Sequence, residues 1–375
     1  MKEIKEILKA YAFAVKNNEK TALATVVKVD GSSYRQPGAR MLITENGELT
    51  GAISGGCLEG DALKKAQLVI FQQQAMLVTY DTTDEDDAKF GVGLGCNGII
   101  HILIEPIIAS TDNNPILLLK ACVKNRMPKV LVTLFDARHK RAAQPGTILL
   151  LDAENATSSN QFDQVKLELK SFVLDKSKSV ISSKKSVILP VNDSGYFAFI
   201  ECMAPAIKLN ILGAGNDVIP LVKLASVMGW EITIADGRSD LVTSHRFPEV
   251  GELLIGKGDE MSGKLAIDSQ TAVVLMTHNF NYDLAILKGL YPYKCPYIGV
   301  LGPKKKLLKL KEQLIKNGIS FQKEDEKVIF GPMGLDIGAE SPEEIALSIL
   351  SEIKAVMTGN MGGYLKSKNG PIHNN

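Results

Sequence analysis

The feature that most constrains the fold is a short apolar run that ends in closely spaced glycines and continues as a helical pattern. Residues 208–212 have the composition of a buried strand, residues 213–215 read Gly-Ala-Gly, and residues 216–228 have helical spacing. The next apolar run, 230–235, ends at Asp236. Strands that alternate with helices favour a doubly wound, Rossmann-like parallel sheet in an α/β protein. Further apolar runs separated by helical segments occupy residues 272–276 and 297–300.

The same segment has the features of a nucleotide-binding turn. Gly213 and Gly215 precede the helix, and Asp236 follows about 20 residues later, where dinucleotide-binding folds place an acidic residue against a ribose hydroxyl. Val218 replaces the third glycine of that fingerprint, which weakens the helix–strand packing argument. We expect a nucleotide, either NAD(P) or another one. His278 ends a predicted strand at the ligand-binding edge, although a capping or core histidine explains it equally well.

A second glycine-rich turn lies nearer the N-terminus, between a predicted strand at 49–53 and a predicted helix at 58–74. It contains Gly55, Gly56 and Cys57. Paired glycines let the backbone turn tightly and approach a ligand, and unpaired N–H groups at a helix start attract phosphate. Such a helix end also favours the thiolate form of a cysteine, which is nucleophilic and binds metals. The alternative is a buried cysteine at a tight turn.

The polar loop 31–40 lies between predicted strands at 21–29 and 41–44. It places hydroxyl groups and guanidinium groups close together along the chain. Guanidinium groups suit phosphate or a planar polar heterocycle, whereas the alternative is a solvated hairpin loop with incidental charges. The candidate ligand-binding residues of this loop are Ser32, Ser33, Arg35 and Arg40.

A third loop, 91–98, has four glycines in eight residues. Glycines at every second position can line a concavity with backbone N–H groups. The candidate ligand-binding residues are Gly95, Cys96 and Asn97. The alternative is a flexible connector, but a connector does not need a cysteine and an asparagine between its last glycines.

Composition excludes several classes of protein. A net charge of +1 over 375 residues provides no basic field for nucleic acid. The five cysteines include no CxxC pair, so we expect neither a disulfide framework nor a zinc cluster. Residues 1–20 mix charges unlike a signal peptide, and no apolar run reaches the roughly 18 residues of a membrane span. We therefore expect a soluble cytoplasmic protein without a membrane partner, in the common twofold homodimeric state.

The predicted organisation has four parts. Residues 1–112 form an N-terminal mixed α+β domain with the glycine–cysteine loops, and residues 113–205 form a less defined α/β region packed with it. Within that region, residues 152–185 are polar and poor in breakers, which favours one helix. Residues 206–360 form the Rossmann-like domain, and residues 361–375 form a tail.

Taken together, these motifs resemble the XdhC/CoxI family. The resemblance covers about residues 5–107 and 205–358, and several unrelated motifs occur in the order of the family. One departure is Asn216, where the family usually has histidine after the second glycine, so no proton-transfer or metal role is assigned there. The motifs are the run from Gly31 through Cys57 to Glu59, residues 93–96 with Ile104-Glu105-Pro106, Met276-Thr277-His278-Asn279, and residues 334–346.

The resemblance implies an accessory protein for molybdenum hydroxylases such as xanthine dehydrogenase. Family members bind molybdenum cofactor, which is molybdenum held by molybdopterin, support its sulfuration by a cysteine desulfurase, and pass it to the apoenzyme. In this chain, Arg35, Arg40 and the helix start at Cys57 become candidates to hold the phosphate or pterin. Cys57 or Cys96 becomes a candidate to contact molybdenum or to carry sulfur.

Two other functions stay open on sequence grounds. One is an NAD(P)-dependent oxidoreductase that uses the Rossmann-like domain, with His278 as its acid or base. The other is a nucleotide-responsive regulatory module in which the cysteine loops are structural. Ferredoxin-like cysteine spacings are absent from the sequence, so we do not expect the chain alone to oxidise purines.

Overall fold

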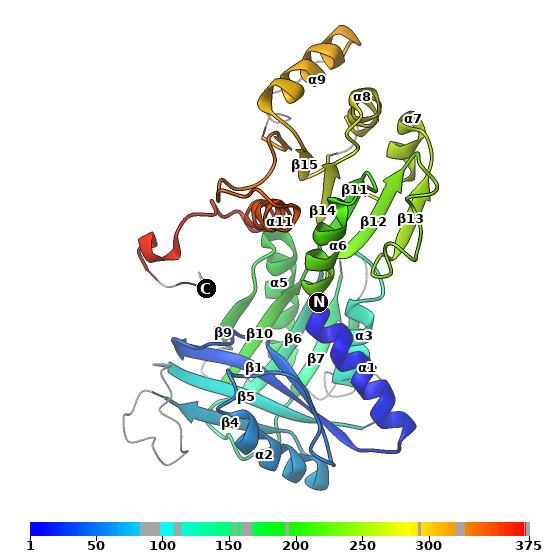
Figure 1. Ribbon diagram of the computed structural model, residues 1–375. Coiled ribbons are helices and arrows are strands. Elements are labelled where there is room, and N and C mark those ends of the chain that lie inside the picture. The colour runs from blue at the N-terminus through cyan, green and yellow to red at the C-terminus, as the bar shows by residue number, and fades with distance from the viewer. Residues whose placement is uncertain are drawn as a thin grey trace. The chain divides into compact units, whose positions relative to one another are not determined.

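The chain forms two compact units, unit 1 over Met1–Pro205 and unit 2 over Ala206–Asn374 (Figure 1). Each unit has its own sheets and hydrophobic cores. The computed structural model describes residues 1–82, 98–108, 114–152, 156–158, 167–191, 195–291, 294–319, 327–370 and 372.

Unit 1 contains two five-stranded antiparallel sheets. The strand order is β3-β2-β1-β5-β4 in the first sheet and β8-β7-β6-β10-β9 in the second. The first sheet consists of β1 Thr21–Gly31, β2 Arg40–Thr44, β3 Leu49–Gly51, β4 Met76–Asp81 and β5 Gly98–Ile107. The second consists of β6 Lys129–Asp136, β7 Gly146–Leu151, β8 Ala156–Ser158, β9 Val187–Pro190 and β10 Tyr196–Met203.

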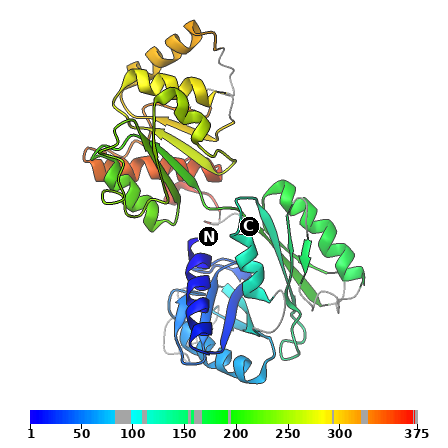
Figure 2. The same cartoon turned by 90° about the vertical axis from the view of Figure 1, so that its right-hand side faces the viewer.

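The two sheets of unit 1 pack face to face, with helices on their outer faces (Figure 2). Neighbouring strand residues point to opposite faces. Val26 of β1 therefore joins the core beneath α2, while Val27 packs with Phe135 and Phe199 of the second sheet. Helix α5 covers the second sheet, and α1 and α3 share a separate core with both sheets. The helices are α1 Lys2–Lys16, α2 Glu59–Gln72, α3 Pro115–Cys122 and α5 Leu167–Ser183.

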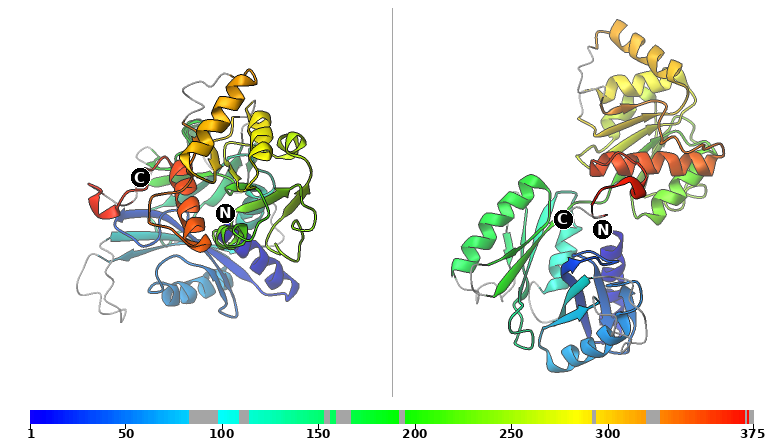
Figure 3. Two further views of the ribbon diagram at one scale, coloured as in Figure 1. Left: turned by 45° about the horizontal axis from the view of Figure 1, so that its top comes forward. Right: turned by 90° about the vertical axis from the view of Figure 1, so that its left-hand side faces the viewer.

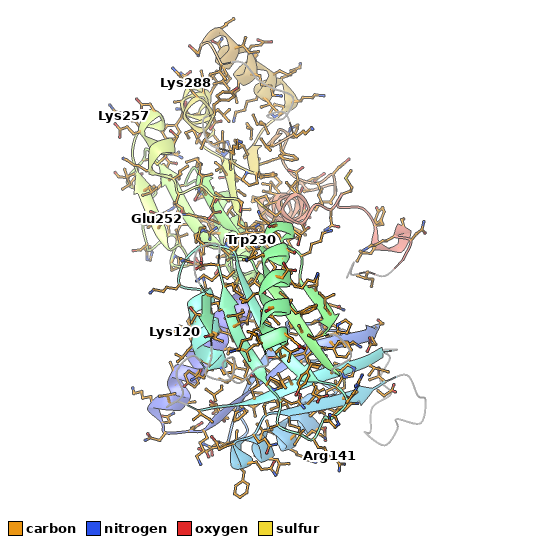
Figure 4. The ribbon with its side chains drawn as sticks, turned by 180° about the vertical axis from the view of Figure 1, so that it is seen from behind. Lys120, Arg141, Trp230, Glu252, Lys257 and Lys288 are labelled. Atoms are coloured by element: carbon orange, nitrogen blue, oxygen red, sulfur yellow. The ribbon has the colours of Figure 1, made fainter. Side chains whose placement is uncertain are left out.

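Unit 2 is a six-stranded parallel sheet in the order β13-β12-β11-β14-β15-β16. Helices α6 and α11 pack together on one face (Figure 3), and α7, α8 and α9 cover the other. Figure 4 labels Trp230, just before β12, and Glu252, the first residue of β13. The strands are β11 Lys208–Leu212, β12 Glu231–Asp236, β13 Glu252–Ile255, β14 Thr271–Leu275, β15 Tyr297–Val300 and β16 Ile329–Phe330. The helices are α6 Val218–Val227, α7 Gly258–Met261, η3 Ser262–Lys264, α8 Phe280–Leu290, α9 Lys304–Lys316, α11 Pro342–Thr358 and η4 Leu365–Ser367.

The predicted fold class is confirmed in both units, because unit 1 is a mixed α/β unit and unit 2 has the parallel Rossmann sheet. The single helix predicted over residues 152–185 is wrong. Its described part contains the three-residue strand β8, and α5 begins only at Leu167. Strand β8 lies at a sheet edge and pairs only with β7 there, so its short polar sequence has no strong strand pattern.

Candidate functional site

The glycine–cysteine turn between β3 and α2 is closed by two of its own side chains. The Ser54 hydroxyl accepts hydrogen bonds from the backbone N–H groups of Gly56 and Leu58, both at 3.1 Å. The Glu59 carboxylate accepts from the backbone N–H of Ser54 at 2.8 Å and from its hydroxyl. These bonds pair N–H groups that a helix start otherwise leaves open. The expectation that this helix end offers its N–H groups to phosphate is therefore wrong at Gly56 and Leu58.

Cys57 remains reachable within this closed turn. Its side chain is half-buried, and the thiol donates to the Ser54 hydroxyl with an Sγ···Oγ distance of 3.6 Å. Burial raises the pKa of Glu59, but hydrogen bonds from the Ser54 side chain and from backbone N–H groups outweigh it and lower that pKa overall. Glu59 is thus an anion at neutral pH. It draws the Ser54 proton toward itself and leaves the Ser54 oxygen as an acceptor for the thiol proton.

The loop at residues 31–40 lies against this turn and against the start of β5. A Cβ atom on Gly55 would be 3.6 Å from the Tyr34 ring, and one on Gly98 would be 2.3 Å from the Ser32 carbonyl oxygen. Ser33 is 8% exposed, and its hydroxyl has no hydrogen-bond partner in the described part of the chain. A buried hydroxyl without a partner is costly, so a ligand that pairs with it gains affinity.

The third predicted loop cannot be placed. Gly95, Cys96 and Asn97 lie outside the described residues, and they directly precede Gly98 in the sequence. Of the two cysteines predicted to contact molybdenum, the structure therefore describes only Cys57. The described residues contain no group of three or more histidine, cysteine or acidic side chains that could hold a metal ion.

The two arginines of the 31–40 loop are engaged with acidic side chains of unit 1. Arg40 is 2% exposed; its guanidinium pairs with Glu201 of β10 and donates to the Gly38 carbonyl oxygen at 2.8 Å. Arg35 pairs with Glu3 of α1, and its Nε has no partner among the described residues. The prediction that Arg40 holds a ligand is therefore corrected, because its buried guanidinium ties the first sheet to the second.

In unit 2, the predicted nucleotide-binding turn follows β11. Gly213 has a φ of +125°, and a Cβ atom there would lie 2.3 Å from the Met276 carbonyl oxygen, so glycine is required where this turn meets the end of β14. Gly215 also approaches a neighbour closely, since a Cβ there would lie 2.4 Å from Asp217 Oδ1. Val218, at the third glycine position, is fully buried in the core against α6.

Asp236 has a different neighbourhood from the one that its sequence position suggested. Its Oδ2 accepts from the Ala214 N–H at 2.8 Å and from Arg238 Nη2 at 2.7 Å. Its Oδ1 accepts from the N–H and the Nε of Arg238 at 2.9 and 3.0 Å. Burial raises the pKa of Asp236, yet the bonds from Arg238 and Ala214 outweigh it and lower that pKa. The carboxylate is ionised but already occupied by donors of the chain itself.

His278 and Asn216 complete this edge. His278 has a φ of +55°, which is strained for a residue with a side chain, and its Nε2 lies 2.8 Å from Asp217 Oδ2. Asn216 accepts from Arg246 Nη2 at 3.1 Å, and the same nitrogen donates to the Ala214 carbonyl oxygen at 3.1 Å. The turn after β11 thus gathers His278 from the end of β14 and Arg246 from the loop after β12.

Several residues of these two places were missed as candidates from the sequence. Ser54 and Glu59 flank Cys57 at the short spacing of a self-closing turn, and that spacing was available as a signal. Arg238 is two residues beyond the predicted ribose-binding Asp236, where the Asp-x-Arg pattern was a second signal. Arg246 had none, because only the path of the folded loop returns it to Asn216.

Two family descriptions match the chain. The family described as the XdhC Rossmann domain matches residues 209–353, and the family described as XdhC and CoxI matches residues 14–81. No helix among the described residues has the length and apolar composition of a membrane span.

The chain is also similar to individual proteins along most of its length. It is 30% identical to a probable xanthine dehydrogenase component of Bacillus subtilis (strain 168) over 339 residues, which cover 90% of this chain and 94% of that protein. It is 24% identical to the molybdenum cofactor insertion chaperone PaoD of Escherichia coli (strain K12), over 93% of this chain and 87% of that one. A crystal structure titled as a xanthine dehydrogenase from Bacillus halodurans matches with a TM-score of 0.73 and 28% identity, and covers 97% of this chain and 98% of its own.

Proposed function

Because the chain belongs to the XdhC and CoxI family, we propose that it is a molybdenum cofactor accessory protein. In this proposal it binds the cofactor as cargo, supports its sulfuration, and inserts it into a molybdenum hydroxylase of the xanthine dehydrogenase type. One relative is named as a cofactor insertion chaperone and another as a component of xanthine dehydrogenase, which supports this class of cargo and client.

The observation that carries the proposal is the line of hydrogen bonds from Cys57 through Ser54 to Glu59. A thiolate is a soft ligand that suits a sulfur-bound metal centre, and removal of its proton needs an acceptor. Ser54 accepts that proton's hydrogen bond, and the Glu59 carboxylate stabilises the arrangement. Cys57 is therefore our candidate to contact molybdenum or to receive sulfur.

The surroundings of Cys57 fit the organic part of the cargo. Gly55 and Gly56 are exposed and add no side chain where a ligand would approach. Ser32 is exposed beside them, and the buried Ser33 hydroxyl lacks a partner among the described residues. Arg35 is the loop arginine that keeps an unpartnered donor within this same part of the chain, so it replaces Arg40 as the candidate for the phosphate.

The proposed partners are an apoenzyme that accepts the cargo and a cysteine desulfurase that supplies sulfur to it. We propose that the chain acts in the cytoplasm as a homodimer. We expect no purine oxidation by the chain alone, because its cysteines lack the spacings of iron–sulfur ligands. Steady urate production by the pure protein would contradict this expectation.

The test is an anaerobic titration of the purified chain with molybdenum cofactor, followed by absorbance and ultrafiltration. We expect stoichiometric binding that Cys57→Ala weakens by about tenfold or more, as loss of a direct ligand does. Cys202→Ala is the matched control, because Cys202 is another half-buried cysteine of unit 1 and lies on β10. Equal binding by wild type and Cys57→Ala would show that Cys57 does not contact the cargo.

A second candidate function belongs to unit 2, where the His278–Asp217 pair lies at the ligand-binding edge of the sheet. An aspartate that orients an exposed imidazole suits an acid or base beside a nucleotide, as in an NAD(P)-dependent oxidoreductase. Turnover of a nicotinamide nucleotide that His278→Ala abolishes would favour this function over a purely regulatory one. Absence of turnover in the wild type would leave the carrier proposal alone.

A further inference from the structure

The ligand-binding edge of unit 2 can be located from its strand order. Counted in chain order, the sheet runs 3-2-1-4-5-6, and the direction of winding reverses between β11 and β14. Open parallel sheets bind nucleotides outside the carboxyl ends of their strands at such a point. Gly213 and Met276 bring the two flanking turns into contact there, and His278 bonds to Asp217 across them.

On the β12 side of this edge, an irregular loop replaces the helix that usually joins the second and third strands. Residues 237–251 contain no helix, and the buried side chains of Val242 and Phe247 anchor the loop in the core of unit 2. The loop delivers two guanidinium groups to the glycine turn. Arg238 is held by Asp236, which bonds to the Ala214 N–H, and Arg246 donates to the Ala214 carbonyl oxygen.

The state of Asp236 determines which ribose substituent can be recognised. A ribose diol needs a carboxylate with open acceptor positions, but both oxygens of Asp236 already accept from Arg238. The group that faces solvent is instead the Arg238 guanidinium, whose side chain is 51% exposed, against 7% for Asp236. In Rossmann units an arginine near this position accommodates a ribose 2′-phosphate.

The remaining charges at this edge are unevenly placed. Asp217 is paired with His278 on the β14 side. Asp240 and Asp217 lie near enough to Arg238 to add to the effect of Asp236, which raises the pKa of that guanidinium. On the β12 side, the Nε of Arg246 is buried and has no hydrogen-bond partner within the described residues. A second donor that lacks an acceptor therefore accompanies Arg238.

We infer that unit 2 binds a nucleotide with a phosphate monoester on its ribose, and that Arg238 contacts this phosphate with Asp236 as its positioning residue. The inference deepens the nucleotide function proposed for unit 2 and is independent of the molybdenum cargo. Arg246 supports the same phosphate from the other side of Ala214. The ligand class is that of NADP(H) rather than NAD(H).

The experiment is isothermal titration of the full-length chain with two matched pairs of ligands, 2′,5′-ADP against 5′-AMP and NADPH against NADH. Each pair differs only in the ribose phosphate. We expect the phosphorylated member to bind about tenfold to a hundredfold more tightly, as charge-assisted hydrogen bonds do. Arg238→Ala should remove that preference, Arg238→Lys should retain part of it, and Lys309→Ala, which removes an exposed charge on α9, should leave it unchanged.

The outcomes separate the phosphate from the nucleotide. Equal affinities within each pair overturn the phosphate assignment and leave nucleotide binding in place. A preference that survives Arg238→Ala, in a variant with the melting temperature of the wild type, overturns the role of Arg238. No binding of any of these ligands to the wild-type chain overturns both the inference and the nucleotide function.

Discussion

The most demanding test of the structure is the buried ion pair between Arg40 and Glu201. Their side chains are 3% and 14% exposed, and the pair joins β2 of the first sheet to β10 of the second. The Arg40 backbone N–H also donates to Glu3 at 3.1 Å. The substitution Glu201→Gln keeps the shape of the side chain but removes the charge that balances the buried guanidinium.

The expected cost can be worked out from this burial. Removal of one partner of a buried ion pair destabilises a protein by about 3–5 kcal/mol, because the other charge remains desolvated. Glu201 keeps some exposure, so we expect about 3 kcal/mol. For a unit of this size that loss lowers the melting temperature by roughly 6–12 °C. Replacement of both residues, as Arg40→Met with Glu201→Leu, should recover most of the loss because no buried charge is left.

Urea unfolding of the full-length chain, followed by circular dichroism, measures this cost. Lys65→Ala is the control, since it breaks the more exposed Lys65–Asp61 pair of α2 and should cost less than about 1 kcal/mol. If Glu201→Gln cost less than about 1 kcal/mol as well, the pair would not be structural. If it weakened cofactor binding at unchanged stability, Arg40 would belong to the ligand site after all.

Three smaller predictions test other contacts. Gly213→Ala should destabilise unit 2 by about 1–3 kcal/mol, because the new Cβ would meet the Met276 carbonyl oxygen at a positive φ; differential scanning calorimetry measures this. Burial raises the pKa of Glu105 above its ordinary 4.5, so the stability that its neutral form confers below pH 4.5 is lost as pH rises through the folded-state pKa. The free energy of unfolding of Glu105→Gln should therefore fall less than that of the wild type between pH 4.5 and pH 8. Ser54→Ala should cost about 1–2 kcal/mol in urea unfolding because Ser54 caps the turn before α2, whereas the exposed Ser32→Ala should stay within about 0.5 kcal/mol.

The fold was predictable where the local pattern and the tertiary context agree. Strands β11 and β15 have the predicted bounds, because central parallel strands are buried on both faces and consist of continuous apolar runs. Strands β9 and β13 were not predicted. They are short strands at sheet edges, where residues are only half-buried and the apolar pattern is weak.

The candidate site was predictable in part. The sequence pointed to the turns at Cys57 and Gly213, because glycines before a helix are a local signal that needs no knowledge of the rest of the chain. It did not reveal that Ser54 and Glu59 occupy N–H groups of the first turn, or that Arg238 saturates Asp236. Such pairings depend on side-chain orientation, which residue types and spacing do not determine.

The two misjudged arginines show what separates a structural guanidinium from a binding one. Arg40 was a candidate ligand residue because it stands in a polar loop, yet its carboxylate partner is 161 residues away and pairing buries both groups between two sheets. Arg238 was overlooked, yet its partner is two residues away, so the pairing fixes its orientation without covering it. A local partner orients a charge at the surface, whereas a distant one joins two parts of the fold and removes the charge from solvent. The sequence separation between an arginine and its carboxylate, once known, therefore says more about its role here than the loop in which it stands.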